Sequence, residues 1–374
     1  MKRALILSLS SGDNYNMVAR AIVNGIVERY PSVSYRSLDV SHGGMHIGDE
    51  YTVSHRLANK IEKYREAKTN RDTSADKLRK IVSGYTKGIT EYISETIKSY
   101  EPDMVVCTHI FPSIVINDLV VAGSTCMKGV KTAYVECNYV ANPLLKLANN
   151  LDYYLCPTDD VAKSLRRYSI NKRAIVQSFG LPILSKIENI TDSKEAKDLL
   201  GYPSGNKVII VDSCGNKHTR AYEVVRELAK TVYDATIVAI CNKDAKLRAR
   251  LDMLSKQYKN IKVYGQANNM GLKLSASDVI ITYTGGVAIA RAIAKGVPVI
   301  AMPDTVGTEM DNLEWLEAKG AVLRSKSVSD VIQLTKKILT NTALVKRCKT
   351  HMEKLYKHNS TDEVVKFLYH NHEK

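Results

Sequence analysis

Residues 281–323 read ITYTGGVAIARAIAKGVPVIAMPDTVGTEMDNLEWLEAKGAVL, and the fold class follows from this stretch. An Ile-rich apolar run leads through Gly285 and Gly286 into an amphipathic segment that begins at Val287. A second apolar run, VPVIAM, follows and opens into a polar loop. Short Val- and Ile-rich runs that alternate with longer amphipathic segments are typical of βαβ units, so we expect a parallel sheet here.

The same alternation extends over most of the chain in two series. In the first half, runs typical of strands begin at residues 3, 33, 104, 132, 153 and 174. After the polar segment 188–207, six more runs follow: KVIIVDS, ATIVAIC, NIKVYG, DVIITYT, VPVIAMP and GAVLRS. The predicted fold class is therefore α/β, with two Rossmann-like parallel-sheet domains.

The polar segment also suggests where the chain divides. We expect an N-terminal domain over residues 1–185 and a C-terminal domain over residues 186–357. The tail from Ser327 contains no run typical of a strand and is predicted to form three helices. Such C-terminal helices are expected to cross back, with residues 358–374 packing on the first domain.

Composition narrows the possible functions. The chain has 374 residues, of which 25% are charged, and its formal net charge is +15, so we expect an anionic partner. Its seven cysteines never show C-x-x-C spacing and lie mostly in apolar runs. No stretch approaches the roughly 18 apolar residues of a membrane helix. These features predict a soluble, cytoplasmic protein with reduced cysteines.

Ligands of open parallel sheets bind beyond the carboxyl ends of the strands, so the loops at those ends are the candidate sites. After the first strand, Gly12 permits a tight turn and Asp13 or Tyr15 is expected to face the cleft. After later strands, Gly285 and Gly286 let a phosphate approach backbone amides at a helix start. The next loop offers side chains able to hydrogen-bond sugar hydroxyls, namely Thr308, Glu309, Asp311 and Asn312 after Gly307.

The order TGG…A…GVPVI…GTEMDN…GA resembles the donor-binding half of the GT-B glycosyltransferases. The nearest likeness is to the monogalactosyldiacylglycerol synthases and processive diacylglycerol glucosyltransferases, and the peptidoglycan GlcNAc transferase is more distant. The resemblance spans nearly the whole chain. It includes GDNY at residues 12–15, CTHIFPSIVI, YVECNYV, YYLCPTDDVAKSL and GLPI.

This resemblance implies transfer of a sugar from a nucleotide sugar, usually UDP-linked, in a cleft between the two domains. It implies no metal or other cofactor, because helix amides and basic groups can stabilise the leaving diphosphate. Gly285 and Gly286 would approach the diphosphate, and Glu309, Asp311 and Asn312 would touch the donor sugar. The diphosphate would be lined from the other side by Ser213, Gly215, Asn216 and Lys217.

Three positions depart from the family pattern. Tyr15 replaces a His of the first loop, so the catalytic base is expected to be Asp13, with His109 and then Glu136 as alternatives. Arg291 replaces the Glu that grips the ribose, and a cation there is suited to phosphate instead. Leu184 replaces an Arg. An inactive, degenerate member of the family is therefore an alternative.

The acceptor is predicted from the segment Arg56–Lys98, which holds eleven Lys or Arg against six acids. The insert from residue 46 to 100 contains neither Phe nor Trp, whereas interfacial helices use aromatic anchors. We therefore expect DNA with hydroxymethylated pyrimidines as the acceptor, contacted by Lys77, Arg79 and Lys80. Diacylglycerol at an anionic membrane surface comes second, and a small molecule or glycan third.

Proteins of other classes remain as alternatives. A nucleotide-sugar 2-epimerase shares the architecture, but the acidic, His-rich cleft that we expect of it is not evident. A non-catalytic DNA-binding protein would account for the charge. The second basic segment, Lys336–Lys374, holds nine Lys or Arg against four acids, and its histidines show no metal-ligand spacing.

Overall fold

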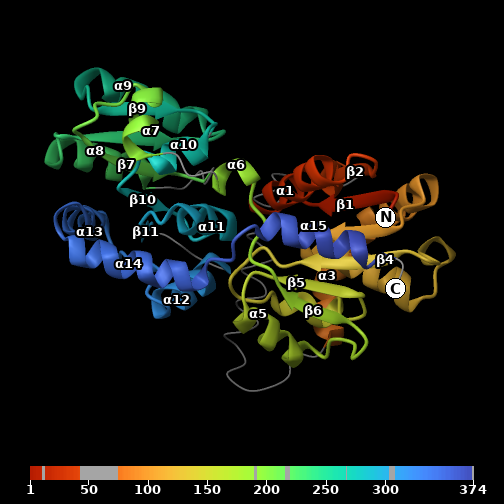
Figure 1. The fold of residues 1–374 in the computed structure, drawn as a ribbon. Helices are drawn as coiled ribbons and strands as arrows, with labels where there is room; N and C mark the ends of the chain where they lie inside the picture. The colour runs from red at the N-terminus through yellow and green to blue at the C-terminus, as the bar shows by residue number, and fades with distance from the viewer. Residues whose placement is uncertain are drawn as a thin grey trace. The chain divides into compact units, whose positions relative to one another are not determined.

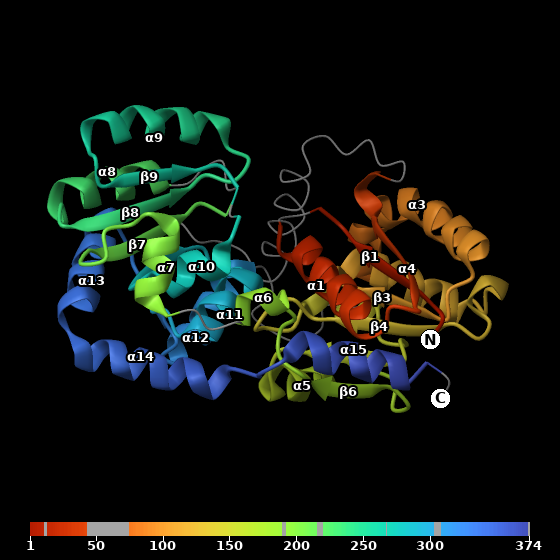
Figure 2. The same ribbon diagram turned by 45° about the horizontal axis from the view of Figure 1, so that its top comes forward.

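The computed structural model describes residues 1–10, 13–42, 75–188, 192–214, 220–266, 268–302 and 308–372 (Figures 1 and 2). The chain divides into two compact units. Unit 1 consists of Met1–Leu184 together with Asn359–Lys374, and unit 2 is Ser185–His358. Each unit is built on one six-stranded sheet.

The sheet of unit 1 has the order β2-β1-β3-β4-β5-β6, and each neighbouring pair is parallel. Every predicted strand start lies within one residue of an observed one. The strands are β1 (Arg3–Ser8), β2 (Ser34–Asp39), β3 (Met104–Cys107), β4 (Lys131–Val135), β5 (Tyr153–Cys156) and β6 (Ile175–Ser178).

Helices connect these strands as parallel pairing requires. They are α1 (Asp13–Arg29), α3 (Ala75–Tyr100), α4 (Ile110–Val121), α5 (Asp159–Ser164) and the C-terminal α15 (Ser360–His370). Short 3-10 helices are η1 (Val40–His42), η2 (Thr125–Met127), η3 (Pro143–Leu147) and η4 (Leu165–Tyr168).

The sheet of unit 2 has the order β12-β11-β10-β7-β8-β9 and is also parallel throughout. Its strands are β7 (Lys207–Asp212), β8 (Ala235–Ile240), β9 (Ile261–Tyr264), β10 (Val279–Thr282), β11 (Val299–Ala301) and β12 (Val322–Leu323). The predicted fold class, two Rossmann-like parallel sheets in an α/β protein, is confirmed.

The helices of unit 2 include two of the three predicted tail helices. They are α6 (Ser185–Glu188), α7 (Ser193–Leu200), α8 (Ala221–Thr231), α9 (Ala245–Gln257), α10 (Met270–Ser275), α11 (Gly286–Lys295), α12 (Thr308–Ala318), α13 (Val328–Thr340) and α14 (Thr342–Leu355). Only the third tail helix, α15, belongs to unit 1.

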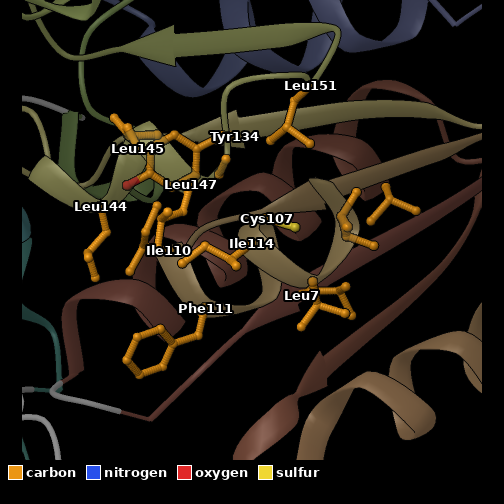
Figure 3. Packing of buried hydrophobic residues seen from close by; sticks show 14 of the residues in the cluster. Leu7, Cys107, Ile110, Phe111, Ile114, Tyr134, Leu144, Leu145, Leu147 and Leu151 are labelled. Atoms are coloured by element: carbon orange, nitrogen blue, oxygen red, sulfur yellow. The ribbon is translucent and has the colours of Figure 1, made fainter. Parts of the chain in front are cut away.

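The inner strands of both sheets are buried and apolar on both faces, as strands covered by helices on each side must be. In unit 1, Leu5, Leu7 and Cys107 face one side and pack in the cluster formed with α3, α4 and η3. Figure 3 shows the meeting of Ile110, Phe111 and Ile114 of α4 with Leu144, Leu145 and Leu147 of η3 in this cluster. In unit 2 the corresponding cluster joins Ile209 and Val211 to α8 and α13.

The other face of the first sheet is covered by α1 and α15, which lie side by side (Figures 1 and 2). The Tyr30 and Tyr369 rings stack with centroids 3.8 Å apart. Arg29 forms an ion pair with Asp362 at 2.5 Å. Gly25 permits the close approach, because a Cβ there would lie 2.9 Å from Cγ2 of Thr361. The last helix is therefore fitted to a gap in the side chains of α1.

We expect Gly25→Ala to destabilise unit 1 by about 1–2 kcal/mol, because the added methyl group overpacks the contact with α15. Gly84→Ala in α3 is the matched control, since a Cβ at Gly84 meets no atom within 4 Å. Both changes improve helix propensity equally, by about 1 kcal/mol. Denaturant unfolding measures both, and equal stabilities would contradict the fitted packing of α15.

Candidate functional site

The two sheets each contain one point at which the winding direction reverses. In unit 1 it lies between β1 and β3, and in unit 2 between β7 and β10. Connections leave such a point toward opposite sides, so a crevice remains beyond the carboxyl ends of the two strands, where ligands of open parallel sheets bind. The candidate sites of the two units are therefore at these two positions.

At the edge of unit 1, Asp39 ties together three segments. Its carboxylate accepts hydrogen bonds from the backbone N and Oγ of Ser10, from Nδ2 of Asn16 at 2.9 Å, and from the backbone N and Oγ of Ser41. Burial by itself raises the pKa of Asp39, but the hydrogen bonds from Ser10, Ser41 and Asn16 outweigh it and lower the pKa to about 2. Ser10 and Asn16 lie on either side of Gly12 and Asp13 in the sequence. Asp39 was not among the residues expected at the site, although an Asp at a strand end with a Ser two residues later is a visible signal.

His109 follows β3, on the other side of the same reversal. It is the N-cap residue of α4, and its Nδ1 accepts a hydrogen bond from the backbone N of Phe111 at 3.1 Å. The neutral ring therefore carries its proton on Nε2. Burial lowers the pKa of His109 to about 3. A ring in this state is poorly suited to accept a proton from a substrate hydroxyl, so the geometry favours a structural role for His109.

Tyr15, which stands where the family has His, lies against this imidazole. The ring centroids of Tyr15 and His109 are 4.5 Å apart in an edge-to-face arrangement. The backbone oxygen of Tyr15 also accepts a hydrogen bond from Thr108 Oγ1 at 3.0 Å. The start of α1 is thus attached to the end of β3.

Glu136 follows β4 and is almost fully buried, with 1% of its surface exposed. Its carboxylate accepts hydrogen bonds from the backbone N of Asn142 at 2.9 Å, the backbone N of Asn138 at 3.1 Å and the hydroxyl of Tyr134 at 3.2 Å. Burial raises the pKa of Glu136 to about 7, and the bonds from Asn142 and Asn138 offset only part of this effect. These contacts assign Glu136 to holding the loop 137–142.

The remaining residues expected in unit 1 are only partly described. Gly12 and the side chain of Asp13 lie outside the described residues, although α1 begins at Asp13. The side chain of Lys77 on α3 is likewise outside them. Arg79 and Lys80 are exposed on α3, and Arg79 forms an ion pair with Asp118 at 2.7 Å. Arg79 is therefore already neutralised by a neighbour within the protein.

In unit 2, the helix that follows the reversal begins at the expected glycines. Gly285 is the N-cap of α11 with φ −64° and ψ 141°, and Gly286 is the first helical residue. The N-cap residue supplies no side-chain hydrogen bond to this end, so among the described residues its first amides are open to another acceptor. Arg291 lies in the second turn with a half-buried side chain. The amino end of α11 therefore has the features of an anion-binding site.

The end of β7 forms a polar cluster beside α11. Asp212 accepts hydrogen bonds from the backbone N of Cys214 at 2.8 Å and from Nδ2 of Asn242 at 2.9 Å. Cys214 Sγ lies 3.0 Å from Thr282 Oγ1 on β10. Ser213 between them is fully buried, and its Oγ has no hydrogen-bond partner among the described residues. The expected positions Gly215, Asn216 and Lys217 lie outside the described residues.

The loop before α11 is also attached to α12. Oγ1 of Thr284 donates to the backbone oxygen of Glu309 at 2.5 Å, and Nδ2 of Asn312 donates to the backbone oxygen of Thr284 at 3.0 Å. Asn312 is fully buried, so its amide serves this attachment. Asp311 and Glu309 are half-buried in the first turn of α12. Thr308 begins that helix, but its side chain and Gly307 lie outside the described residues.

In the described part of the chain, no three side chains of His, Cys, Asp or Glu come together as a metal site requires. Among the described helices, none has both the length and the hydrophobicity to cross a membrane.

Family models match both halves of the chain. Residues 45–183 match monogalactosyldiacylglycerol (MGDG) synthase, and residues 216–364 match the glycosyltransferase family 28 C-terminal domain. One relative is the processive diacylglycerol beta-glucosyltransferase of Bacillus cereus (strain AH187), which is 24% identical over 290 residues, 77% of this chain and 72% of that protein.

Solved structures share the fold over nearly the whole chain. The UDP-GlcNAc 2-epimerase from Neisseria meningitidis, bound to UDP-GlcNAc, has a TM-score of 0.64 at 15% identity and covers 99% of this chain and 100% of its own. MurG of Acinetobacter baumannii has a TM-score of 0.61 at 13% identity, with the same coverage. These identities show the fold alone, whereas the two family models bear on the activity.

The buried carboxyl of Glu136 leads to a prediction about stability. Its folded pKa of about 7 lies above the ordinary 4.5, so the folded state binds the proton more tightly than the unfolded chain does. This stabilisation is fully present below pH 4.5 and is lost as the pH rises through about 7. Relative to Glu136→Gln, which cannot ionise, the wild-type protein should lose on the order of 3 kcal/mol over this range.

Denaturant unfolding of both proteins at several pH values between 4 and 8.5 measures this difference. The Gln side chain keeps the volume of Glu. A difference in unfolding free energy that is constant with pH therefore reports the altered hydrogen bonds, and only a difference that changes with pH reports ionisation of Glu136. Parallel pH profiles for the two proteins would mean that Glu136 does not titrate in this range.

Proposed function

Because the chain is a glycosyltransferase of the GT-B fold, we propose that it transfers a sugar from a UDP-sugar to the hydroxyl of diacylglycerol. The observation that carries the proposal is that the family model over residues 45–183 and the relatives over 77% of the chain point to the same lipid. The UDP donor is supported by the likeness to an epimerase bound to UDP-GlcNAc.

This proposal reverses the order of acceptors that the charge pattern suggested. The basic segment Arg56–Lys98 led us to expect DNA ahead of lipid, but the MGDG synthase model and the Bacillus cereus relative are named for diacylglycerol lipids. Of the three side chains expected to contact DNA, Arg79 is paired with Asp118. The relatives named for diacylglycerol therefore outweigh a charge pattern that anionic lipid attracts equally well.

Unit 2 is suited to hold the donor. The uncapped amides of α11 and the missing side chains at Gly285 and Gly286 allow a diphosphate to approach closely, and the positive end of the helix dipole stabilises its charge. The buried Ser213 directly follows the carboxyl end of β7, the strand next to β10 in the sheet. In the transfer, the acceptor oxygen bonds to C1 of the sugar while the bond from C1 to the diphosphate oxygen breaks, and UDP leaves with the electron pair.

The acceptor hydroxyl must lose its proton in this step, and Asp13 is the carboxyl proposed to take it. His109 has its Nδ1 engaged by the Phe111 amide, and Glu136 is buried among donors. Asp13 remains, at the start of α1, and Ser10 and Asn16 on either side of it in the sequence both donate hydrogen bonds to Asp39. No metal is needed for this chemistry, since fixed amides and a base supply the charge stabilisation and the proton transfer.

The acceptor is tested by incubating the protein with UDP-glucose or UDP-galactose and either diacylglycerol in detergent micelles or duplex DNA with hydroxymethylated cytosine. We expect glycosylated diacylglycerol by mass spectrometry. Asp13→Asn should reduce its rate by about 100-fold or more with donor affinity nearly unchanged, because general-base catalysis is typically worth 10²- to 10⁴-fold. Asp198→Asn, at an exposed carboxyl of α7, is the control. Sugar on the DNA and none on the lipid would refute the proposal.

Gly286→Val tests the donor site. A branched side chain at the first residue of α11 blocks the approach of phosphate to the amides, so UDP affinity should fall about 10-fold or more, which corresponds to about 1.4 kcal/mol. Gly205→Val is the matched control in the same unit, because a Cβ there meets no atom within 4 Å. Calorimetric titration with UDP measures both, and unchanged affinity in a folded Gly286→Val protein would exclude this end of α11 as the diphosphate site.

A further inference from the structure

One surface of unit 1 is rich in cations and is not used by the proposed transfer. Residues 161–187 contain no Asp or Glu, and the central part of this stretch carries five exposed basic side chains: Lys163, Arg166, Arg167, Lys172 and Arg173. We call these five residues the η4 patch. Within the part of the chain that the structure describes, none of the five side chains forms an ion pair. Their charge is therefore available to a partner.

The fold presents the η4 patch on a rigid support. Leu165 and Val161 anchor α5 and η4 in the core of unit 1. The turn that follows is held by asparagines: Asn149 Nδ2 donates to the backbone oxygen of Ser169 at 3.2 Å, and Oδ1 of Asn171 accepts from the backbone N of Arg173 at 3.0 Å. Ser169 has φ 56°, a conformation that these bonds maintain. The cations thus project from a preformed turn and need little ordering.

The position of the η4 patch separates it from the candidate site of unit 1. The turn precedes β6, so Lys172 and Arg173 lie at the amino end of that strand, whereas the candidate site of unit 1 lies at carboxyl ends. β6 is also the edge strand, beyond β5 (Figure 1). An apolar side chain, Ile175, is 41% exposed directly after the basic turn. The η4 patch therefore lies at an outer edge of unit 1, where its cations adjoin the exposed apolar side chain of Ile175.

We propose that the η4 patch docks unit 1 on an anionic phospholipid surface. Clusters of four to eight Lys and Arg bind such surfaces, each contributing about five-fold in affinity, and Arg adds paired hydrogen bonds to phosphate. The exposed Ile175 favours lipid over nucleic acid, because it suits the boundary between headgroups and acyl chains. The inference rests on the proposed function for its choice of lipid, since an enzyme acting on diacylglycerol must work at a membrane surface.

The test is sedimentation of the full chain with vesicles of phosphatidylcholine alone or with 40% phosphatidylglycerol. The reversal variant combines Arg166→Glu, Arg167→Glu, Lys172→Glu and Arg173→Glu. We expect wild-type protein to bind only the anionic vesicles and the variant to bind them more weakly by roughly 600-fold or more, from about five-fold for each of the four cations. A charge-matched control on unit 2 combines Lys346→Glu, Arg347→Glu, Lys349→Glu and Lys354→Glu on the exposed side of α14 and should retain binding within about five-fold.

Circular dichroism establishes that both variants are folded. The four substituted side chains of the patch are exposed, and none of them forms an ion pair within the described part of the chain. Equal losses in the two variants would show that net charge alone attracts the vesicles, and would overturn the proposal. So would patch-dependent binding of duplex DNA that is tighter than vesicle binding at the same salt concentration. Vesicle binding requires no donor, so this result is independent of whether diacylglycerol is glycosylated in micelles.

Discussion

The reversal of winding direction in each parallel sheet is the constraint on which the candidate sites depend. Two parallel strands must be joined by a crossover connection, which is right-handed. Crossovers toward one edge of the sheet therefore place their helices on one face of the sheet, and crossovers toward the other edge place theirs on the opposite face. Between β1 and β3, and between β7 and β10, neighbouring connections therefore diverge. The resulting space lies where α1 and α11 begin, at the ends that attract anions and hydroxyls.

Carboxylates near strand ends hold the loops around these spaces. Asp39 joins Ser10, Asn16 and Ser41, Asp212 joins Cys214 to Asn242, and Glu136 holds the backbone of Asn138 and Asn142. Each accepts bonds from backbone or amide groups that would otherwise be left unpaired. Their environments differ, since hydrogen bonds outweigh burial at Asp39 and burial outweighs hydrogen bonds at Glu136. The same residue class thus gives one carboxyl with a low pKa and one with a high pKa.

Two groups of exposed cations in the described part of the chain lie on α14 and on the η4 patch. The start of α11 instead offers backbone amides and glycines, with the half-buried Arg291 in its second turn. Amides at fixed positions can select one small anion by geometry, whereas mobile surface cations attract any extended anionic partner.

The sequence by itself determined the architecture of this protein. Local periodicity, which acts over a few residues, predicts the Val- and Ile-rich strands and the amphipathic helices between them. Local backbone freedom likewise predicts the helix start at Gly285 and Gly286. The sequence also indicated the family through GTEMDN and its neighbours. It did not determine the roles of single polar residues. His109 was expected to be an alternative base, and only the fold buries it and turns Nδ1 to the Phe111 amide. Asp39 and Thr284 bond to residues distant in the chain, so only tertiary packing, which sets burial and hydrogen-bond partners, decided what they hold together.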